Sequence, residues 1–339
     1  MEELIGRRMM KKELPAAAAR AVDQALGSPA MYEVDQARVG CHRCDTISLK
    51  EQVRLKNHRF FCPACIQLGR VESQEVLYHV PEPPPIPRNV LLAWAGQLSE
   101  AQKEVSLRMR EAALRKRNTL VWAVTGAGKT EMIFQALLVE LQQGYRVCIA
   151  SPRVDVCLEL YPRIKAAFPE EAVALLHGGA TEEYRYTKLV ICTTHQLLRF
   201  YQAFDLLIID EVDAFPYAGE LLLHTGVRNA LKQKASLIYL TATPTKSLRR
   251  LIQRKELQLL LLPARYHRRL LPVPKLRWSA KWRESVNAGR LPKGLFKLVT
   301  RLMVQNDVLL FCPTIAVLQH VHLLFAQALP CTSMAAVHS

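Results

Sequence analysis

The chain has 339 residues, of which 50% are hydrophobic and 22% are charged, proportions typical of a folded globular protein with about two to three domains. It has no apolar run long enough to span a membrane, and its first residues lack the apolar core of a secretory signal peptide. The formal net charge of +16 favours a polyanionic partner, and we expect nucleic acid rather than an anionic membrane surface.

Three segments are expected before residue 88. Residues 1–35 are predicted to be helical because they contain an Ala-rich run at 15–19. Residues 36–80 carry two cysteine pairs among short strand-like pieces. Residues 81–87 are rich in proline, which predicts a semi-rigid linker and a domain boundary.

The cysteine pairs predict a structural metal site. Each pair has the spacing Cys-x-x-Cys, and the spacer between the pairs falls within the range of about 15–20 residues that is typical of zinc modules. Two such turns aim four thiolates at one point and complete a tetrahedral Zn²⁺ site with no open position. The odd total of nine cysteines argues against a disulfide framework and indicates a reducing cytoplasm. The predicted ligands are Cys41, Cys44, Cys62 and Cys65.

From residue 88 to 262, apolar strands alternate with amphipathic helices, which predicts an α/β fold with a parallel sheet. A basic stretch follows at 263–294. Residues 295–339 are expected to begin a second domain, with a strand over 308–312 and a helix over 316–328. The strands expected in the main sheet are Thr119–Val124, Arg146–Ser151, Leu189–Thr194, Leu206–Asp210 and Leu237–Thr241.

A phosphate-binding loop is predicted after the first of these strands, before a helix expected over 131–142. Glycines in such a loop let consecutive backbone N–H groups turn toward a phosphate. We expect Lys129 to bridge the β- and γ-phosphates of ATP and the Thr130 hydroxyl to bind Mg²⁺. The loop residues expected to hold the nucleotide are Thr125, Gly126, Ala127, Gly128, Lys129 and Thr130.

An acidic element completes this site. The apolar run 204–209 ends in Asp210-Glu211-Val212-Asp213, and adjacent carboxylates at a strand end need a compensating cation. We expect Asp210 to hold Mg²⁺ and Glu211 to orient and deprotonate the attacking water. Lys129, Asp210 and Glu211 are therefore the predicted catalytic residues.

These motifs resemble those of superfamily-2 helicases. Residues 123–130 resemble motif I, with Ala123 in place of the first glycine of the general phosphate loop, and Asp210–Asp213 resemble the DExD motif II. Gln102 resembles the upstream residue that reads adenine. The resemblance implies two RecA-like lobes that bind ATP and Mg²⁺. It also implies that Thr241 and Thr243, in a segment similar to motif III, couple the ATP state to nucleic acid.

Cysteine pairs ahead of such a motor narrow the resemblance to the ComFA family of late competence proteins. The resemblance implies DNA-dependent ATP hydrolysis, movement of single-stranded DNA during natural transformation, and the partners ComFC and ComEC at the inner face of the cell membrane. Homo-oligomerisation stays open. DNA contacts are expected at strand ends, with helix capping as the alternative for Ser151 and Thr193. The expected contact residues are Ser151, Arg153, Thr193 and Thr194.

A second candidate surface for DNA combines basic and aromatic residues. Residues 265–269 are basic with one tyrosine, and Trp278 and Trp282 follow them, although the two tryptophans are equally consistent with a core. Such a surface would bind a strand through its phosphates and stack on its bases.

The sequence departs from the helicase pattern in its second lobe. No QxxGRxxR motif VI is present, so we expect a truncated lobe and weak hydrolysis, because arginine stabilisation is worth about 10³–10⁵ in rate. Two alternatives remain. One is a replication-restart helicase resembling PriA, in which the cysteine module is inserted later in the chain. The other is a non-catalytic fragment whose DNA affinity does not depend on Lys129.

Overall fold

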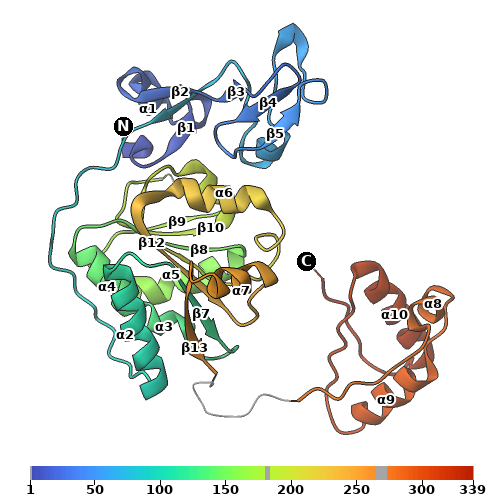
Figure 1. Ribbon diagram of the computed structural model, residues 1–339. Coiled ribbons are helices and arrows are strands. Elements are labelled where there is room, and N and C mark those ends of the chain that lie inside the picture. Colours follow the sequence, from blue (N-terminus) through green and yellow to red (C-terminus); the bar gives the residue numbers. More distant parts are fainter. Residues whose placement is uncertain (1, 180–183, 264–272, 339) are drawn as a thin grey trace. The chain divides into compact units, whose positions relative to one another are not determined.

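The computed structural model describes residues 2–179, 184–263 and 273–338. The chain divides into two compact units, Met1–Leu270 and Leu271–Ser339 (Figure 1). The first unit contains the cysteine pairs, the phosphate loop and the acidic element, and the second is a small helical unit. The basic residues at 265–269 lie outside the described part of the chain.

A seven-stranded sheet forms the centre of the first unit, with the strand order β13-β7-β12-β11-β8-β10-β9. Every neighbouring pair in it is parallel, which confirms the predicted α/β fold. The expected strands form within a few residues of their predicted bounds, and two further strands, β9 and β13, extend the sheet. The strands are β7 Thr119–Ala123, β8 Val147–Ser151, β9 Val173–Leu176, β10 Leu189–Thr193, β11 Phe204–Ile209, β12 Leu231–Thr241 and β13 Gln258–Leu262.

Both faces of this sheet are covered, which explains why its strands are continuously apolar. Alternate residues of each strand point to opposite faces. On one face Val121 and Ile149 pack with α2, α4 and α5, and on the other Leu120 and Ala150 pack with α6, α7 and the cysteine-containing region. The helices are α2 Glu100–Leu114, α3 Lys129–Met132, α4 Phe134–Gln142, α5 Val154–Ala167, 3-10 helix η6 Thr194–Arg199, α6 Leu221–Ala230 and α7 Lys246–Gln253.

The predicted helical segment over residues 1–35 is wrong. The Ala-rich run forms only the short helix α1, Ala16–Arg20, and most of the remaining segment forms short strands and 3-10 turns. One three-stranded sheet has the order β1-β6-β2 and a second has the order β3-β4-β5. These strands are β1 Arg8–Met10, β2 Leu26–Pro29, β3 Met31–Glu33, β4 Arg38–Cys41, β5 Ile47–Leu49 and β6 Val76–His79, with 3-10 helices η1 Glu2–Leu4, η2 Lys11–Glu13, η3 Val22–Gln24, η4 Lys56–His58 and η5 Pro63–Leu68.

The proline-rich segment is not a boundary between compact units. The extended chain that follows β6 lies against the main sheet's helices, where the Arg88 amide donates to the Gln142 carbonyl (2.9 Å) and the Ala93 amide donates to the Ala167 carbonyl (2.8 Å). A side chain at Gly144 would lie 2.1 Å from the Ile86 carbonyl oxygen, so this glycine permits the close approach. Prolines here fix an extended conformation, and tertiary contacts hold it in place.

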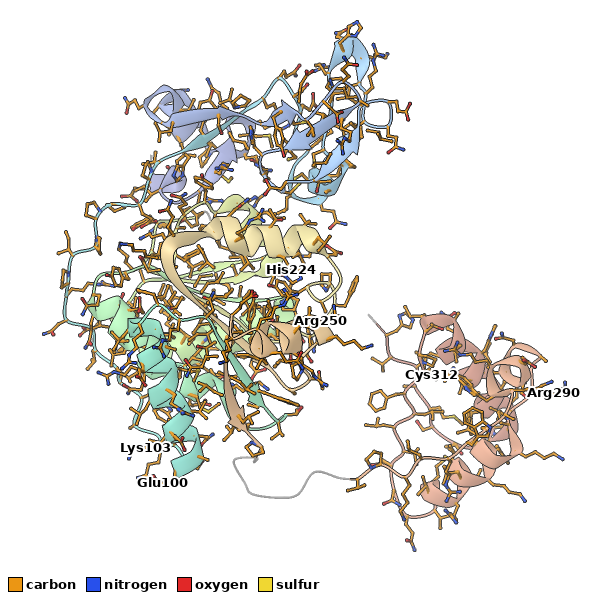
Figure 2. The ribbon with its side chains drawn as sticks, in the orientation of Figure 1. Glu100, Lys103, His224, Arg250, Arg290 and Cys312 are labelled. Atoms are coloured by element: carbon orange, nitrogen blue, oxygen red, sulfur yellow. The ribbon has the colours of Figure 1, made fainter. Side chains whose placement is uncertain are left out.

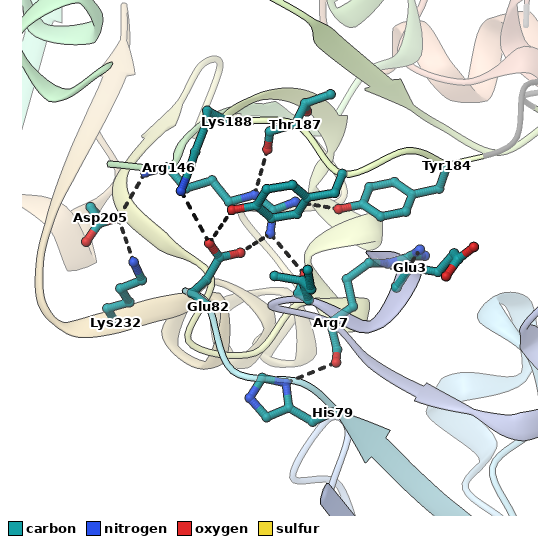
Figure 3. Close-up of polar contacts among 12 residues, drawn as sticks. Glu3, Arg7, His79, Glu82, Arg146, Tyr184, Thr187, Lys188, Asp205 and Lys232 are labelled. Atoms are coloured by element: carbon teal, nitrogen blue, oxygen red, sulfur yellow. Dashed lines mark hydrogen bonds and ion pairs between the residues drawn. The ribbon is translucent and has the colours of Figure 1, made fainter. Parts of the chain in front are cut away.

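A buried ion pair anchors this segment at its start. The side chains of Arg146 and Glu82 are 0% and 3% exposed, and one guanidinium nitrogen of Arg146 also donates to the Ile5 carbonyl (3.1 Å). Arg146 Nε donates to the Thr187 carbonyl (3.0 Å), and the Tyr186 hydroxyl donates to Glu82 (2.7 Å). Figure 3 shows these contacts as dashed lines. They connect the first residues, the proline-rich segment and the main sheet.

The described part of the second unit contains three helices, α8 Trp282–Asn287, α9 Lys293–Met303 and α10 Ile315–Ala328. Its small core includes Val286, Val299 and Phe325, with Trp282 packed against it, whereas Trp278 is exposed. The predicted strand over 308–312 does not form, and Leu309 and Phe311 are 84% and 90% exposed. A strand needs a hydrogen-bonded neighbour, and the described part of this unit holds none.

None of the described helices combines the length and the apolar character that crossing a membrane requires.

We predict that Glu82→Ala lowers the free energy of unfolding of the first unit by about 3–5 kcal/mol, because it leaves the buried Arg146 without its counter-ion. Urea denaturation followed by circular dichroism measures this change. Glu104→Ala is the matched control, since Glu104 forms an exposed ion pair with Arg108 (3.8 Å), and its effect should stay within about 0.5 kcal/mol. Equal effects of the two substitutions would contradict the anchoring role.

Candidate functional site

The four cysteine sulfurs converge on one point. All four ligand atoms lie within 4.8 Å of one another, with Sγ–Sγ distances of 3.9 Å between Cys41 and Cys65 and 3.5 Å between Cys44 and Cys62. A tetrahedral Zn²⁺ with Zn–S bonds of about 2.3 Å needs sulfurs about 3.8 Å apart. All four side chains are buried, so the donor set fits a closed structural zinc site.

Local backbone structure positions the two cysteine pairs. Cys41 ends strand β4, and the turn after it is closed by the Asp45 amide, which donates to the Cys41 carbonyl (2.8 Å). Cys62 precedes η5, and its amide donates to the Val71 carbonyl (2.9 Å). The cysteines belong to the same buried cluster as one face of the main sheet. The site is therefore part of the first unit's core.

The phosphate loop connects β7 to α3. Gly126 and Gly128 have φ values of +77° and +68°, a conformation that residues with a side chain rarely adopt. Thr125 and Gly126 are exposed, whereas the Thr130 side chain is largely buried beside the loop. Ala123 is fully buried as the last residue of β7 and lies outside the turn itself. A glycine is therefore not needed at this position.

Gln102 lies beside this loop. Its Nε2 donates to the Ala127 carbonyl (2.7 Å), and its Oε1 accepts from the amide of Ser99 (2.8 Å), which caps α2. A side chain at Gly128 would come within 2.7 Å of the Gln102 amide, so the two residues are in close contact. Both Nε2 and Oε1 of Gln102 are thus hydrogen-bonded within the protein, and in this structure the Gln102 side chain supports the phosphate loop. Its predicted role as adenine reader stays a prediction.

The acidic element lies at the same edge of the sheet as the phosphate loop, because β7, β12 and β11 are adjacent parallel strands. Burial raises the pKa of Asp210 to about 6, and the nearby Lys129 ammonium acts in the opposite direction. Within the same balance, the hydrogen bond from the Glu211 amide lowers the pKa of Asp210, and the neighbouring Glu211 and Asp213 carboxylates raise it. This concentration of negative charge beside one ammonium fits a divalent cation such as Mg²⁺.

Asp213 connects the acidic element to the end of β12. Its two carboxylate oxygens accept from the hydroxyls of Thr241 (2.6 Å) and Thr243. The Thr243 amide also donates to the Thr241 hydroxyl (3.0 Å). In addition, Trp122 Nε1 in β7 donates to the Ala242 carbonyl (2.9 Å), a contact that sequence analysis missed because a tryptophan in an apolar strand gives no sign of it.

The residues predicted to contact DNA differ in accessibility. Ser151 and Thr194 are fully buried and Thr193 is nearly so. Their predicted contacts with a DNA strand stay a prediction. The Ser151 hydroxyl accepts from the Arg153 amide (3.4 Å) before α5 begins. Arg153 is the N-cap of α5 and Thr193 is the N-cap of η6, and neither makes a side-chain cap hydrogen bond, so the structure does not support the capping alternative. Arg153 is the exposed member of the predicted set.

A shallow cavity of about 500 Å³ lies at the start of α2, and two of its lining residues, Leu98 and Glu100, belong to the segment around Gln102 that resembles the adenine-reading element. Figure 2 shows Glu100 and Lys103 close together at this end of the helix. The other lining residues, among them Lys103, Ser106 and Gln135, carry no motif from which the cavity could be predicted. The cavity is lined by Gln97, Leu98, Glu100, Lys103, Ser106, Leu107 and Gln135.

Comparison with known proteins adds the family. Residues 102–251 match the family model described as DEAD/DEAH box helicase. The competence protein ComFA of Bacillus subtilis (strain 168) is 38% identical over 291 residues, which cover 84% of this chain and 63% of that protein. ComFA of Streptococcus pneumoniae (strain ATCC BAA-255 / R6) is 44% identical over 263 residues, which cover 78% of this chain and 60% of that protein.

The replication restart protein PriA of Rickettsia typhi is less similar, at 26% identity over 193 residues that cover 52% of this chain and 29% of that protein. The chain spans less than two thirds of the length of either ComFA relative. The similarity to ComFA nevertheless extends over about four fifths of this chain. Together with the helicase match, it places the chain in the ComFA family of DExD-box helicase-like proteins.

Proposed function

We propose that the chain binds and hydrolyses ATP as part of a motor that moves single-stranded DNA. The observation that carries this proposal is the link from Asp213 to the hydroxyls of Thr241 and Thr243. It joins the acidic element of the ATP site to a neighbouring strand end, so a change at the γ-phosphate has a direct route to that strand. A site that only bound ATP would not need this connection.

In the proposed ATP complex, the amides of the phosphate loop and Lys129 surround the β- and γ-phosphates. Thr130 and Asp210 would hold Mg²⁺, which would offset the charge that develops during transfer of the phosphoryl group. Glu211 orients the attacking water and accepts its proton. The cavity at the start of α2, lined by Glu100 and Lys103 on either side of Gln102 in the sequence, is the proposed place of the base.

The motor is proposed to act in DNA uptake during transformation, because the two relatives with identities of 38% and 44% are named competence protein ComFA. ComFC and ComEC are the proposed partners, at the inner face of the cell membrane, and assembly of several copies is a further proposal. The PriA alternative is less supported, since those relatives share a smaller part of the chain at lower identity.

The decisive test of the proposed function is ATP hydrolysis with and without single-stranded DNA. Lys129→Ala should lower turnover by a factor of about 10² or more, because it removes the cation at the transferred phosphate. Lys165→Ala, at an exposed position of α5, should leave turnover unchanged. If Lys129→Ala and the original chain turn over ATP equally, the ATPase proposal is wrong, and salt-sensitive DNA binding without turnover would support the non-catalytic alternative.

The contacts of Asp213 generate a second prediction. Thr241→Val and Thr243→Val remove its hydrogen-bond donors with little change of volume. We expect ATP turnover to stay within about tenfold of the original, since neither residue is proposed to touch the phosphates, while its stimulation by single-stranded DNA is lost. A steady-state ATPase assay over a range of DNA concentrations measures both quantities. Full retention of DNA stimulation would exclude the coupling role.

We also propose that the four cysteines hold one Zn²⁺ per chain. Because their cluster is continuous with one face of the main sheet, removing the metal should destabilise the whole first unit by several kcal/mol. Cys62→Ser should lower the zinc content measured by atomic emission spectroscopy and lower the melting temperature. Cys331→Ser, at an exposed cysteine outside the cluster, should change neither. A zinc-free preparation with an unchanged melting temperature would contradict a structural metal.

A further inference from the structure

Arg153 and Glu211 meet at the carboxyl edge of the main sheet. Arg153 follows strand β8 and Glu211 follows strand β11, and these two strands are adjacent and parallel, with Ile209 paired to Ala150. Arg153 Nη1 lies 3.6 Å from Glu211 Oε2. The residue proposed to activate water is therefore in contact with the cation proposed to bind a DNA phosphate.

The arginine is held in this position by a second carboxylate. Its Nε donates to Asp155 Oδ1 (3.1 Å), and its Nη2 pairs with the other oxygen of the same carboxylate at the start of α5. Two of the three guanidinium nitrogens are thus used by Asp155, which directs the third, Nη1, at Glu211. The Asp155 hydrogen bond, followed by the charges of Glu211 and Asp155, raises the pKa of Arg153.

Glu211 has a restrained backbone. Its φ of +54° lies in the left-handed region, which a residue with a side chain adopts at an energetic cost, and its amide donates to Asp210 Oδ1 (2.9 Å). Its side chain is directed toward the end of β8 and faces a guanidinium there. This contact orients one carboxylate oxygen toward the guanidinium and so restricts the directions in which Glu211 presents its lone pairs to an attacking water.

The same guanidinium is accessible to nucleic acid. The Arg153 and Glu211 side chains are 51% and 36% exposed, whereas the hydroxyls of Ser151 and Thr194 beside them are buried. A DNA phosphate offers oxygens that bind guanidinium more strongly than a single carboxylate contact at 3.6 Å does. The phosphate and Glu211 therefore compete for one cation.

We propose that Arg153 is a DNA-sensing positioning residue, which holds Glu211 in the absence of DNA and releases it when a phosphate of the strand binds the guanidinium. This inference rests on the proposed function, since it requires a chain that hydrolyses ATP and binds single-stranded DNA. An exposed ion pair is worth roughly 0.2–1 kcal/mol, which corresponds to a factor of about 1.4–5 in an equilibrium constant. The expected effects are of that size.

A double-mutant cycle on DNA affinity tests the competition without depending on hydrolysis. The probe is a fluorescein-labelled oligothymidine, and its Kd is measured by anisotropy for the full chain. Glu211→Gln should tighten binding about two- to fivefold, because Arg153 no longer has a competitor. In an Arg153→Ala background the same substitution should have no effect. An equal gain in both backgrounds would mean that Glu211 repels DNA independently of Arg153, and would overturn the inference.

ATP turnover supplies the second readout. Arg153→Ala should raise the DNA-free rate about two- to fivefold and reduce the stimulation by DNA, whereas Arg153→Lys, which keeps the charge, should retain part of the stimulation. Arg108→Ala, which removes an exposed arginine of α2, should leave both rates unchanged. A DNA-free rate that is unchanged or lower in Arg153→Ala would overturn the inference.

Failure of the proposed function and failure of the role of Arg153 give different results. A chain with neither Lys129-dependent turnover nor DNA binding refutes the proposed function and this inference with it. A chain that turns over ATP and binds DNA, but whose double-mutant cycle is additive, refutes only the role of Arg153.

Discussion

Coverage of both faces of the parallel sheet is the constraint on which the rest of the first unit depends. With α2, α4 and α5 on one face and the cysteine region, α6 and α7 on the other, the polar ends of the strands are left at the edges. Lys129, Asp210, Asp213 and Arg153 all follow carboxyl ends of strands in this sheet. Their proximity is a consequence of strand order. Residues far apart in the sequence follow neighbouring parallel strands, and the carboxyl ends of those strands lie at the same edge of the sheet.

A buried ion pair lies at the opposite edge of the sheet, where the strands begin. There the Arg146 guanidinium is enclosed by Glu82, Tyr184 and the Ile5 carbonyl, which come from three distant parts of the chain. A charge buried this deeply is tolerated only with its partners in place. Ile5 and Glu82 flank the cysteine region in the sequence, so this network ties both ends of that region to the main sheet. The region and the sheet also share a buried core within one compact unit.

Sequence patterns predicted those parts of the molecule that depend on residues close together in the sequence. The parallel sheet and the family are confirmed, since apolar runs and loop glycines are read directly from neighbouring residues. The helix expected over residues 1–35 failed because β1 and β2 pair with β6, a partner about 50 residues or more away that no local pattern reveals. Ser151 and Thr194 were placed at the correct strand ends, but their burial depends on side chains from other elements. The roles assigned to the site residues stay predictions.

Two arginine–glutamate pairs in this chain show how burial decides what an ion pair can do. Arg146–Glu82 is closed to solvent, so breaking it leaves a desolvated charge and is strongly unfavourable, which suits a permanent anchor. Arg153–Glu211 is half exposed and longer, at 3.6 Å, so water or a phosphate replaces either partner at little cost. This weakness is what a sensor requires. One phosphate of a bound DNA strand could not displace Glu211 from Arg153 if that contact were worth several kcal/mol. The same pair of residue types therefore serves as an anchor at one edge of the sheet and, in our proposal, as a switch at the other.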